Sequence, residues 1–227
     1  MSDGNSRSIT SNQSGVHEDL IKVVDKHLNS EFRKPYAPFS VATFEYLQTK
    51  VEAFLNQNPN GSIILDSCCG VGESSYHHAV ANPDCFVVGI DKSEHRIDKH
   101  EHHHLNKVNN CELVRGDLND LWRMIADADW PIKAHFILYP NPWPKSKHLQ
   151  RRWHGAPVFK YIPKLGGQLT VRSNWPIYIQ EFAMALEQCG IKADVMDYSS
   201  EESITPFERK YWASGQKSVQ LVAELNN

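Results

Sequence analysis

The chain has 227 residues, a net charge of −3 and 41% hydrophobic residues, a composition typical of a globular protein with a single core. It contains no apolar run near the roughly 18 residues of a membrane span and no cationic-then-apolar signal at Met1, so we expect a cytoplasmic protein with no membrane partner. Five cysteines without a CxxC pair argue against a disulfide framework and a cysteine zinc site.

The N-terminal part combines a polar segment with two predicted helices. Residues 1–15 are mainly Ser, Asn, Gln, Thr and Gly, with Ile9 as the single aliphatic residue, which predicts a disordered tail. Two stretches with helical spacing of apolar residues follow, joined by a basic, Pro-rich loop from Arg33 to Pro38. We therefore expect a helical extension over residues 16–60 and the main domain over residues 61–227.

Seven short apolar or β-branched runs alternate with helical stretches in the main domain. This alternation predicts an α/β fold with a mostly parallel sheet. The last run follows a stretch without a helical pattern, Ile204 to Gly215, so we expect its strand to enter by a hairpin, antiparallel to its neighbours. The expected strands cover residues 63–66, 86–91, 112–115, 135–139, 168–172, 192–196 and 218–224.

The first of these strands leads into a loop typical of nucleotide-type ligands. Asp66 ends the strand, and the loop Ser67-Cys68-Cys69-Gly70-Val71-Gly72 precedes a helix that begins at Glu73. Gly70 and Gly72 allow a ligand to approach the backbone closely. The helix directs its free N–H groups at that ligand.

Three acids follow three successive strands: Asp66, Asp91 and Asp117. Asp91 is placed to accept both hydroxyls of a ribose. A nicotinamide dinucleotide is one alternative, because Gly70 to Ser75 is similar to a GxGxx pattern, but acids beside its pyrophosphate would repel it. S-adenosylmethionine carries no phosphate; its cationic amine and sulfonium favour acids, and its purine amine can donate to Asp117. The pattern favours S-adenosylmethionine, with a loop that binds no cofactor as the remaining alternative.

A histidine-rich stretch matches the zinc pattern HExxH. His100 and His104 would share one face of a helix, as zinc ligands do. The sequence offers no obvious third ligand, and a solvated histidine-rich face explains the run equally well. We therefore expect no metal site.

The run that ends at Tyr139 opens into a loop with prolines on both sides of Asn141. Each proline restricts the residue before it, which holds Asn141 in an extended conformation. The Asn141 amide can both donate and accept a hydrogen bond. A purely structural turn is an equal alternative.

Bases gather after this loop without any compensating acid. Residues 141–172 contain seven of them, which indicates either a solvated face or contact with a polyanion. The seven are Lys145, Lys147, Arg151, Arg152, Lys160, Lys164 and Arg172.

The Asp66 loop, Asp91, Asp117 and the stretch PNPWPKSKHLQRR together resemble the tRNA (guanine-N7)-methyltransferases. Ser173-Asn174-Trp175 and TPFERK from Thr205 extend the resemblance, which covers residues 63–225. It implies a seven-stranded, Rossmann-like methyltransferase sandwich that uses S-adenosylmethionine to methylate N7 of guanine in tRNA. It implies cofactor binding at Asp66, Ser67, Cys68, Gly70, Gly72, Asp91, Lys92, Asp117, Leu118 and Asn141, and RNA contact at Lys145, Lys147, Arg151, Arg152, Asn174, Thr205, Phe207 and Glu208.

The chain departs from that family at three positions. Asn141 replaces the aspartate taken as catalytic, Asn174 replaces an aspartate, and Cys68 replaces a glycine. Guanine N7 is unprotonated at neutral pH, so methyl transfer needs alignment rather than a strong base. Our hypothesis is that Asn141 is the catalytic residue and donates its NH2 group to guanine O6.

Two alternatives remain for the function. Asn-Pro-aromatic at Asn141 is similar, in part, to the motif of amino-group and amide methyltransferases, which favours a different nitrogen acceptor: a small molecule, a purine amine or an amide. The second alternative is a non-catalytic relative that binds RNA through the basic stretch.

Overall fold

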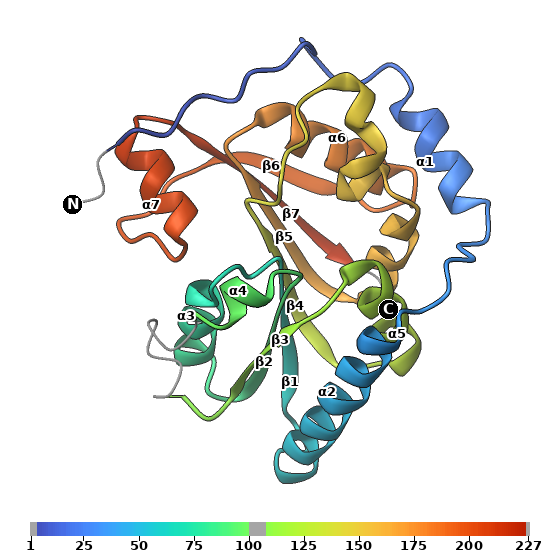
Figure 1. The fold of residues 1–227 in the computed structure, drawn as a ribbon, viewed down its shortest axis with the longest axis vertical. Coiled ribbons are helices and arrows are strands. Elements are labelled where there is room, and N and C mark those ends of the chain that lie inside the picture. The colour runs from blue at the N-terminus through green and yellow to red at the C-terminus, as the bar shows by residue number, and fades with distance from the viewer. Residues whose placement is uncertain (1–3, 100–107, 226–227) are drawn as a thin grey trace.

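A seven-stranded sheet forms the centre of the computed structural model, which describes residues 4–99 and 108–225 (Figure 1). The strands are β1 (Ser62–Ser67), β2 (Cys85–Asp91), β3 (Cys111–Arg115), β4 (Ile132–Leu138), β5 (Gly167–Ser173), β6 (Ala193–Tyr198) and β7 (Ser218–Leu225). They lie in the order β3-β2-β1-β4-β5-β7-β6. The first five run parallel and β7 is antiparallel to both neighbours, which confirms the predicted sheet.

Helices cover both faces of this sheet. The α-helices are α1 (Leu20–Leu28), α2 (Pro38–Gln57), α3 (Glu73–Ala81), α4 (Glu94–Ile97), α5 (Leu118–Ala128), α6 (Pro176–Glu187) and α7 (Pro206–Ala213), and the 3-10 helices are η3 (Ser146–Arg151), η4 (Trp153–Gly155) and η5 (Pro157–Leu165). α3 packs on β1, β2 and β3, whereas α1, α2, α5, α6 and η5 form a connected layer. The chain adds β2 and β3 on one side of β1 and then crosses back to add β4 and β5 on the other side. Because crossovers between parallel strands are right-handed, this change of side places the two groups of helices on opposite faces of the sheet. Within the described residues, no helix is long and apolar enough to cross a membrane.

Alternate residues of the parallel strands face two separate apolar clusters. Ile63 and Leu65 pack in the larger cluster, which includes residues of α5, whereas Ile64 and Val87 pack in a smaller cluster beside α3. Burial on both faces explains why the strands are continuous apolar runs rather than alternating ones.

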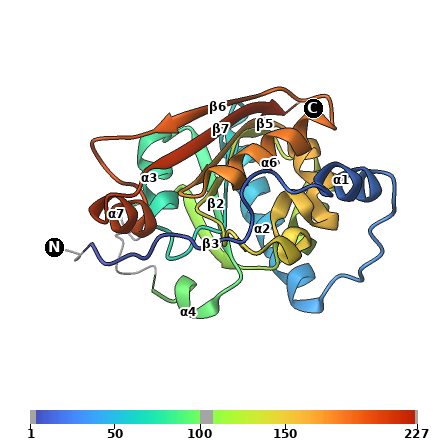
Figure 2. The ribbon, with the colours of Figure 1, turned by 90° about the horizontal axis from the view of Figure 1, so that it is seen from above.

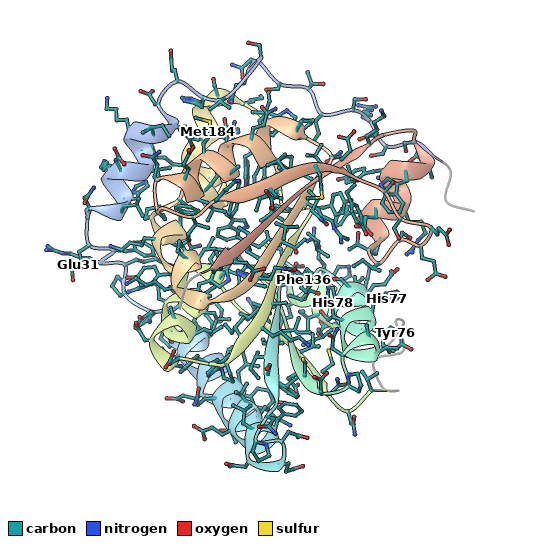
Figure 3. All side chains as sticks on the ribbon, turned by 180° about the vertical axis from the view of Figure 1, so that it is seen from behind. Glu31, Tyr76, His77, His78, Phe136 and Met184 are labelled. Atoms are coloured by element: carbon teal, nitrogen blue, oxygen red, sulfur yellow. The ribbon has the colours of Figure 1, made fainter. Side chains whose placement is uncertain are left out.

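The ring of His78, on α3, stacks on Phe136 of β4 with ring centroids 3.9 Å apart (Figure 3). Burial lowers the pKa of His78 to about 4, so the ring is neutral at pH 7. This contact packs α3 against the sheet, and α3 begins at Glu73, directly after the predicted cofactor loop.

The helix α7 lies in the connection where no helix was expected, so that prediction is wrong. Thr205 caps the helix: its Oγ1 accepts a hydrogen bond from Glu208 N at 3.0 Å, and Glu208 Oε2 accepts one from Ile204 N at 2.8 Å. The Thr205 hydroxyl is therefore the N-cap of α7, and Pro206 suits the first helical position. The chain still returns antiparallel to β6, as predicted.

The N-terminal segment, residues 4–17, includes most of the stretch for which composition predicts a disordered tail. It runs as an extended chain from α7 to α1 (Figures 1 and 2). Ser6 N donates to Ser214 Oγ at 3.0 Å, and Ser11 Oγ donates to Pro144 O at 2.6 Å. Hydrogen bonds therefore hold a segment whose few apolar residues gave no signal of order.

Candidate active site

The carboxyl ends of β1 and β4 lie side by side, with Ser67 paired in register with Ile137. From β1 the chain builds the sheet toward β2 and β3, and from β4 it builds toward β5. Such a switch point opens a crevice at the carboxyl ends of the strands. The loop after β1 and the loop after β4 face this crevice.

Asp66, at the end of β1, is 1% exposed. Its Oδ2 accepts hydrogen bonds from the hydroxyls of Ser74 and Ser75, both at 2.6 Å. Its Oδ1 has no partner among the described residues, and burial raises the pKa of this carboxyl to about 6. A buried carboxylate oxygen without a donor is costly, so it suits a cationic ligand group.

The loop after β1 is shaped by two left-handed glycines. Gly70 has φ +63° and Gly72 has φ +80°. A Cβ added at Gly70 would meet nothing within 4 Å, so the backbone there is open to a ligand. Asp91 Oδ2 accepts from Gly70 N at 3.0 Å and its Oδ1 accepts from Ser93 N at 2.8 Å, which leaves second lone pairs for a ligand.

Asp117 lies at the N-terminus of α5, where its Oδ1 accepts from Asn119 N at 3.0 Å. Its Oδ2 is 3.3 Å from Lys92 Nζ and 3.5 Å from Lys34 Nζ. Burial alone would raise the pKa of Asp117, but the hydrogen bonds from Asn119 and the two lysines lower it, so the group is ionised at pH 7. Leu118, the next residue, was also predicted to bind the cofactor, and its side chain is buried in the core.

Ser67 and Cys68 occupy different environments in the loop. The Ser67 hydroxyl lies in the core, 2.9 Å from His135 Nε2 and 3.0 Å from Trp122 Nε1, so only the backbone of Ser67 is left for the predicted cofactor contact. Cys68 has φ +63°, a conformation that favours glycine and explains the glycine at this position in the family that the sequence resembles. Burial raises the pKa of the Cys68 thiol to about 12, so it is neutral.

A cavity lies between this loop and α7. It is lined by Cys68, Cys69, Gly70, Val71, Ser74, Arg96, Leu138, Thr205, Pro206 and Phe207. Arg209 on α7 bonds both carboxylate oxygens of Glu73 at 2.8 Å, which ties α7 to the start of α3. The ion pair therefore fixes one wall of the cavity against the other.

The acceptor loop, Pro140–Ser146, follows β4 at the same edge. Tyr139 and Trp143 have φ of +50° and +46°, a conformation that costs about 1–3 kcal/mol for a residue other than glycine. Asn141 is exposed, and its Oδ1 accepts a hydrogen bond from Trp143 N at 3.3 Å. Its Nδ2 has no partner in the described part of the chain, so the NH2 group is available as a donor.

Lys145, Lys147 and Arg151 are exposed beside the acceptor loop. Arg151 lies over the ring of Trp143, with 4.8 Å between the guanidinium carbon and the ring centroid. These three side chains can reach a ligand outside the crevice, and they give this edge a positive charge.

Arg152 differs completely from its neighbour, because it is fully buried. Its guanidinium forms an ion pair with Glu181 on α6 and donates to Trp143 O and Lys145 O at 3.2 and 3.3 Å. The RNA contact predicted for Arg152 is therefore wrong. Arg172 is likewise paired inside the protein, so the basic stretch presents fewer free charges than the sequence suggested.

The segment from Thr205 is mainly structural. Thr205 and Glu208 are 5% and 0% exposed, and Glu208 pairs with Arg172 at 2.9 Å. Both side chains are engaged within the protein, Thr205 at the start of α7 and Glu208 in its ion pair, so their contact with RNA stays a prediction. Phe207 is 37% exposed and lines the cavity, and Asn174 Nδ2 donates to Gln216 Oε1 at 2.8 Å.

Several residues of the site were not predicted from the sequence. Ser74 and Ser75 hold Asp66, and their position in the first turn of the helix after Gly72 was an available signal. The sequence gave no signal for Arg96, whose Nη1 lies 3.5 Å from Asp91 Oδ2. The histidines of the HExxH match lie outside the described residues, and within residues 4–99 and 108–225 no three potential ligands gather around a metal position.

Comparisons with known proteins agree with this geometry. A family model described as "Putative methyltransferase" matches residues 60–221. A tRNA (guanine-N(7)-)-methyltransferase of Clostridium beijerinckii is 24% identical over 83% of this chain and 92% of its own.

Among solved structures, the 16S rRNA methyltransferase KamB has a TM-score of 0.59 at 17% identity, covering 79% of this chain and 94% of its own. A 16S rRNA (adenine(1408)-N(1))-methyltransferase from Catenulisporales acidiphilia, solved with the cosubstrate SAM, has a TM-score of 0.57 at 18% identity, covering 78% and 92%. These two show the shared fold.

The fold and the matched family define a Rossmann-like methyltransferase. The chain belongs to this methyltransferase family and is an S-adenosylmethionine-dependent enzyme, as the sequence predicted. The resemblance to the tRNA (guanine-N7)-methyltransferases is confirmed by the curated relatives.

Proposed function

We propose that the enzyme methylates N7 of guanine in tRNA. The observation that carries this proposal is the position of the acceptor loop, whose exposed Asn141 and neighbouring bases share one sheet edge with the acid-lined loop after β1. Relatives named tRNA (guanine-N(7)-)-methyltransferase support the same substrate. Residues 61–227 form the catalytic domain in this proposal, and the five free cysteines fit action in the reducing cytoplasm.

The residues around the crevice fit S-adenosylmethionine. The unpartnered Oδ1 of Asp66 would accept from the cationic amine, and the open backbone at Gly70 would lie against the methionine part. Asp91 would accept from the ribose hydroxyls and Asp117 from the purine amine. When bound, S-adenosylmethionine supplies an electrophilic methyl group on its sulfonium.

Asn141 orients the guanine that accepts the methyl group and does not transfer a proton. Its Oδ1 is held by Trp143 N, so its NH2 group is directed outward as a donor for guanine O6. That hydrogen bond would orient the guanine so that its N7 lone pair faces the methyl group that bound S-adenosylmethionine would supply, with the electrons of the broken S–C bond left on sulfur. No proton moves in this step, which explains how an amide serves where relatives have a carboxylate.

Lys145, Lys147 and Arg151 serve the RNA backbone. They are exposed, and within the described residues no acidic side chain forms an ion pair with any of them. Contacts of this kind position a nucleic acid and make its binding depend on salt.

The test offers labelled S-adenosylmethionine with total tRNA and, separately, with a small-metabolite extract. We expect label in tRNA, and nucleoside mass spectrometry should identify 7-methylguanosine. Label only in the extract, or on a different nitrogen of tRNA, would favour the acceptor that Asn141 and Asn174 suggest. Binding of tRNA with no transfer to either pool would overturn the proposal.

A further inference from the structure

The N-terminal segment forms hydrogen bonds with two residues of the acceptor loop, Pro144 and Ser146. Ser11 Oγ donates to Pro144 O at 2.6 Å. Asn12 pairs twice with Ser146: its Oδ1 accepts from Ser146 N at 3.0 Å and its Nδ2 donates to Ser146 Oγ at 3.2 Å. These residues are more than 130 positions apart in the chain, so the contacts are tertiary and fix one side of the loop.

Gln13 inserts its amide between two buried charges. Its Oε1 accepts from Arg152 Nη2 at 3.0 Å, and its Nε2 donates to Glu181 Oε1. Arg152 and Glu181 are both 0% exposed, and His154 Nε2 is 2.9 Å from the second carboxylate oxygen of Glu181. A buried ion pair needs its remaining hydrogen bonds satisfied, and the Gln13 amide provides one to each partner.

The same arginine holds the acceptor loop. Arg152 Nε and Nη2 both donate to Trp143 O at 3.2 Å, and Nη2 donates to Lys145 O at 3.3 Å. Trp143 has φ +46°, and its N–H donates to Asn141 Oδ1. A continuous series of contacts therefore runs from Gln13 through Arg152 and the strained Trp143 peptide to Asn141.

We propose that Gln13 is a positioning residue for methyl transfer, and that the N-terminal segment is part of the acceptor site. A non-glycine residue keeps a positive φ only where its surroundings over-determine it. At Trp143 one of these restraints is Arg152, whose Nη2 donates to both Trp143 O and Gln13 Oε1. Loss of Gln13 would let the Trp143 peptide relax and Asn141 lose its alignment.

This inference rests on the proposed function, and its test measures methyl transfer to tRNA in a single turnover with both substrates saturating. We expect Gln13→Ala to lower that rate by about 10- to 100-fold, since small losses of alignment have effects of this size. The dissociation constant for S-adenosylmethionine should stay unchanged, because Gln13 is not among the residues that line the cavity. Exposed Ser14, changed to Ala, is the matched control and should transfer at the wild-type rate.

A double-mutant cycle separates positioning from general destabilisation. If Gln13 acts through Asn141, Gln13→Ala should have little further effect in an Asn141→Ala background, whereas independent effects would multiply. Gln13→Glu keeps the acceptor for Arg152 but sets a like charge against Glu181, so it should not restore the rate. If Gln13→Ala fails to fold, Asn12→Ala at the exposed end of the segment should show the same loss of rate without loss of cofactor affinity.

Two results would overturn the inference: a wild-type rate for Gln13→Ala, or a rate loss that multiplies fully with that of Asn141→Ala. Either can occur while the wild-type enzyme methylates tRNA, so the inference can fail alone. Failure of the proposed function would instead appear as absence of transfer by the wild-type enzyme.

Discussion

Replacing Arg152 by methionine tests whether this residue is structural, as its burial indicates, or a phosphate contact. Arg152→Met keeps most of the aliphatic length and removes the charge, which leaves Glu181 buried without its cation. Removing one partner of a buried pair costs about 3–5 kcal/mol. For a chain of this size each kcal/mol lowers Tm by about 2–4 °C, so we expect a fall of about 6–20 °C.

Two measurements read out this variant. Calorimetry gives the change in Tm. The double variant Arg152→Met with Glu181→Gln should recover part of the lost Tm, because it leaves no buried carboxylate without a cation. The salt dependence of tRNA binding, measured well below Tm, should match that of the wild type. An unchanged Tm together with a salt slope lower by about one would refute the reasoning, because that pattern is produced by a phosphate contact.

Three further predictions concern other parts of the site. Asp66→Asn should weaken S-adenosylmethionine binding at pH 7.5 by about 10- to 100-fold. In calorimetric titration the affinity of the wild type should fall as the pH drops through about 6, because Asp66, with its raised pKa, is then protonated, and the affinity of the variant should show no such fall. Lys145→Ala and Arg151→Ala should each lower the salt slope of tRNA binding by about one, with Lys133→Ala, at the start of β4, as a control that leaves the slope unchanged. Thr205→Ala should destabilise the protein by about 1 kcal/mol through loss of the α7 cap, seen in denaturant unfolding; unchanged stability would contradict the capping role.

The central strands could be predicted from the sequence because they are buried on both faces, as β1 and β2 are. The run from Phe86 to Ile90 is apolar throughout, and Asp91, which ends it, marks the carboxyl edge. The loop after β1 was visible for a similar local reason, since Gly70 and Gly72 adopt backbone conformations that few other residues tolerate. Local sequence determines both features.

The errors arose where distant contacts decide a residue's environment. Arg151 and Arg152 are adjacent and chemically identical, yet only Arg152 meets Glu181, which lies 29 positions later on α6. The order of the N-terminal segment depends on polar contacts such as Gln13 with Arg152, which leave no hydrophobic pattern. A local signal of α7 was present in Thr205 followed by Pro206, but Thr205 was interpreted as an RNA contact rather than as a helix cap.

The most direct test of the account compares wild-type enzyme with Asn141→Ala and Asn141→Asp in single-turnover methylation of tRNA, with 7-methylguanosine quantified by mass spectrometry. The account predicts formation of 7-methylguanosine by the wild type and a rate lower by about 10- to 100-fold for Asn141→Ala. Asn141→Asp removes the NH2 donor and leaves only acceptor oxygens, so its rate should fall as well. An alanine variant with the full transfer rate would contradict the role of Asn141 as the residue that orients the guanine.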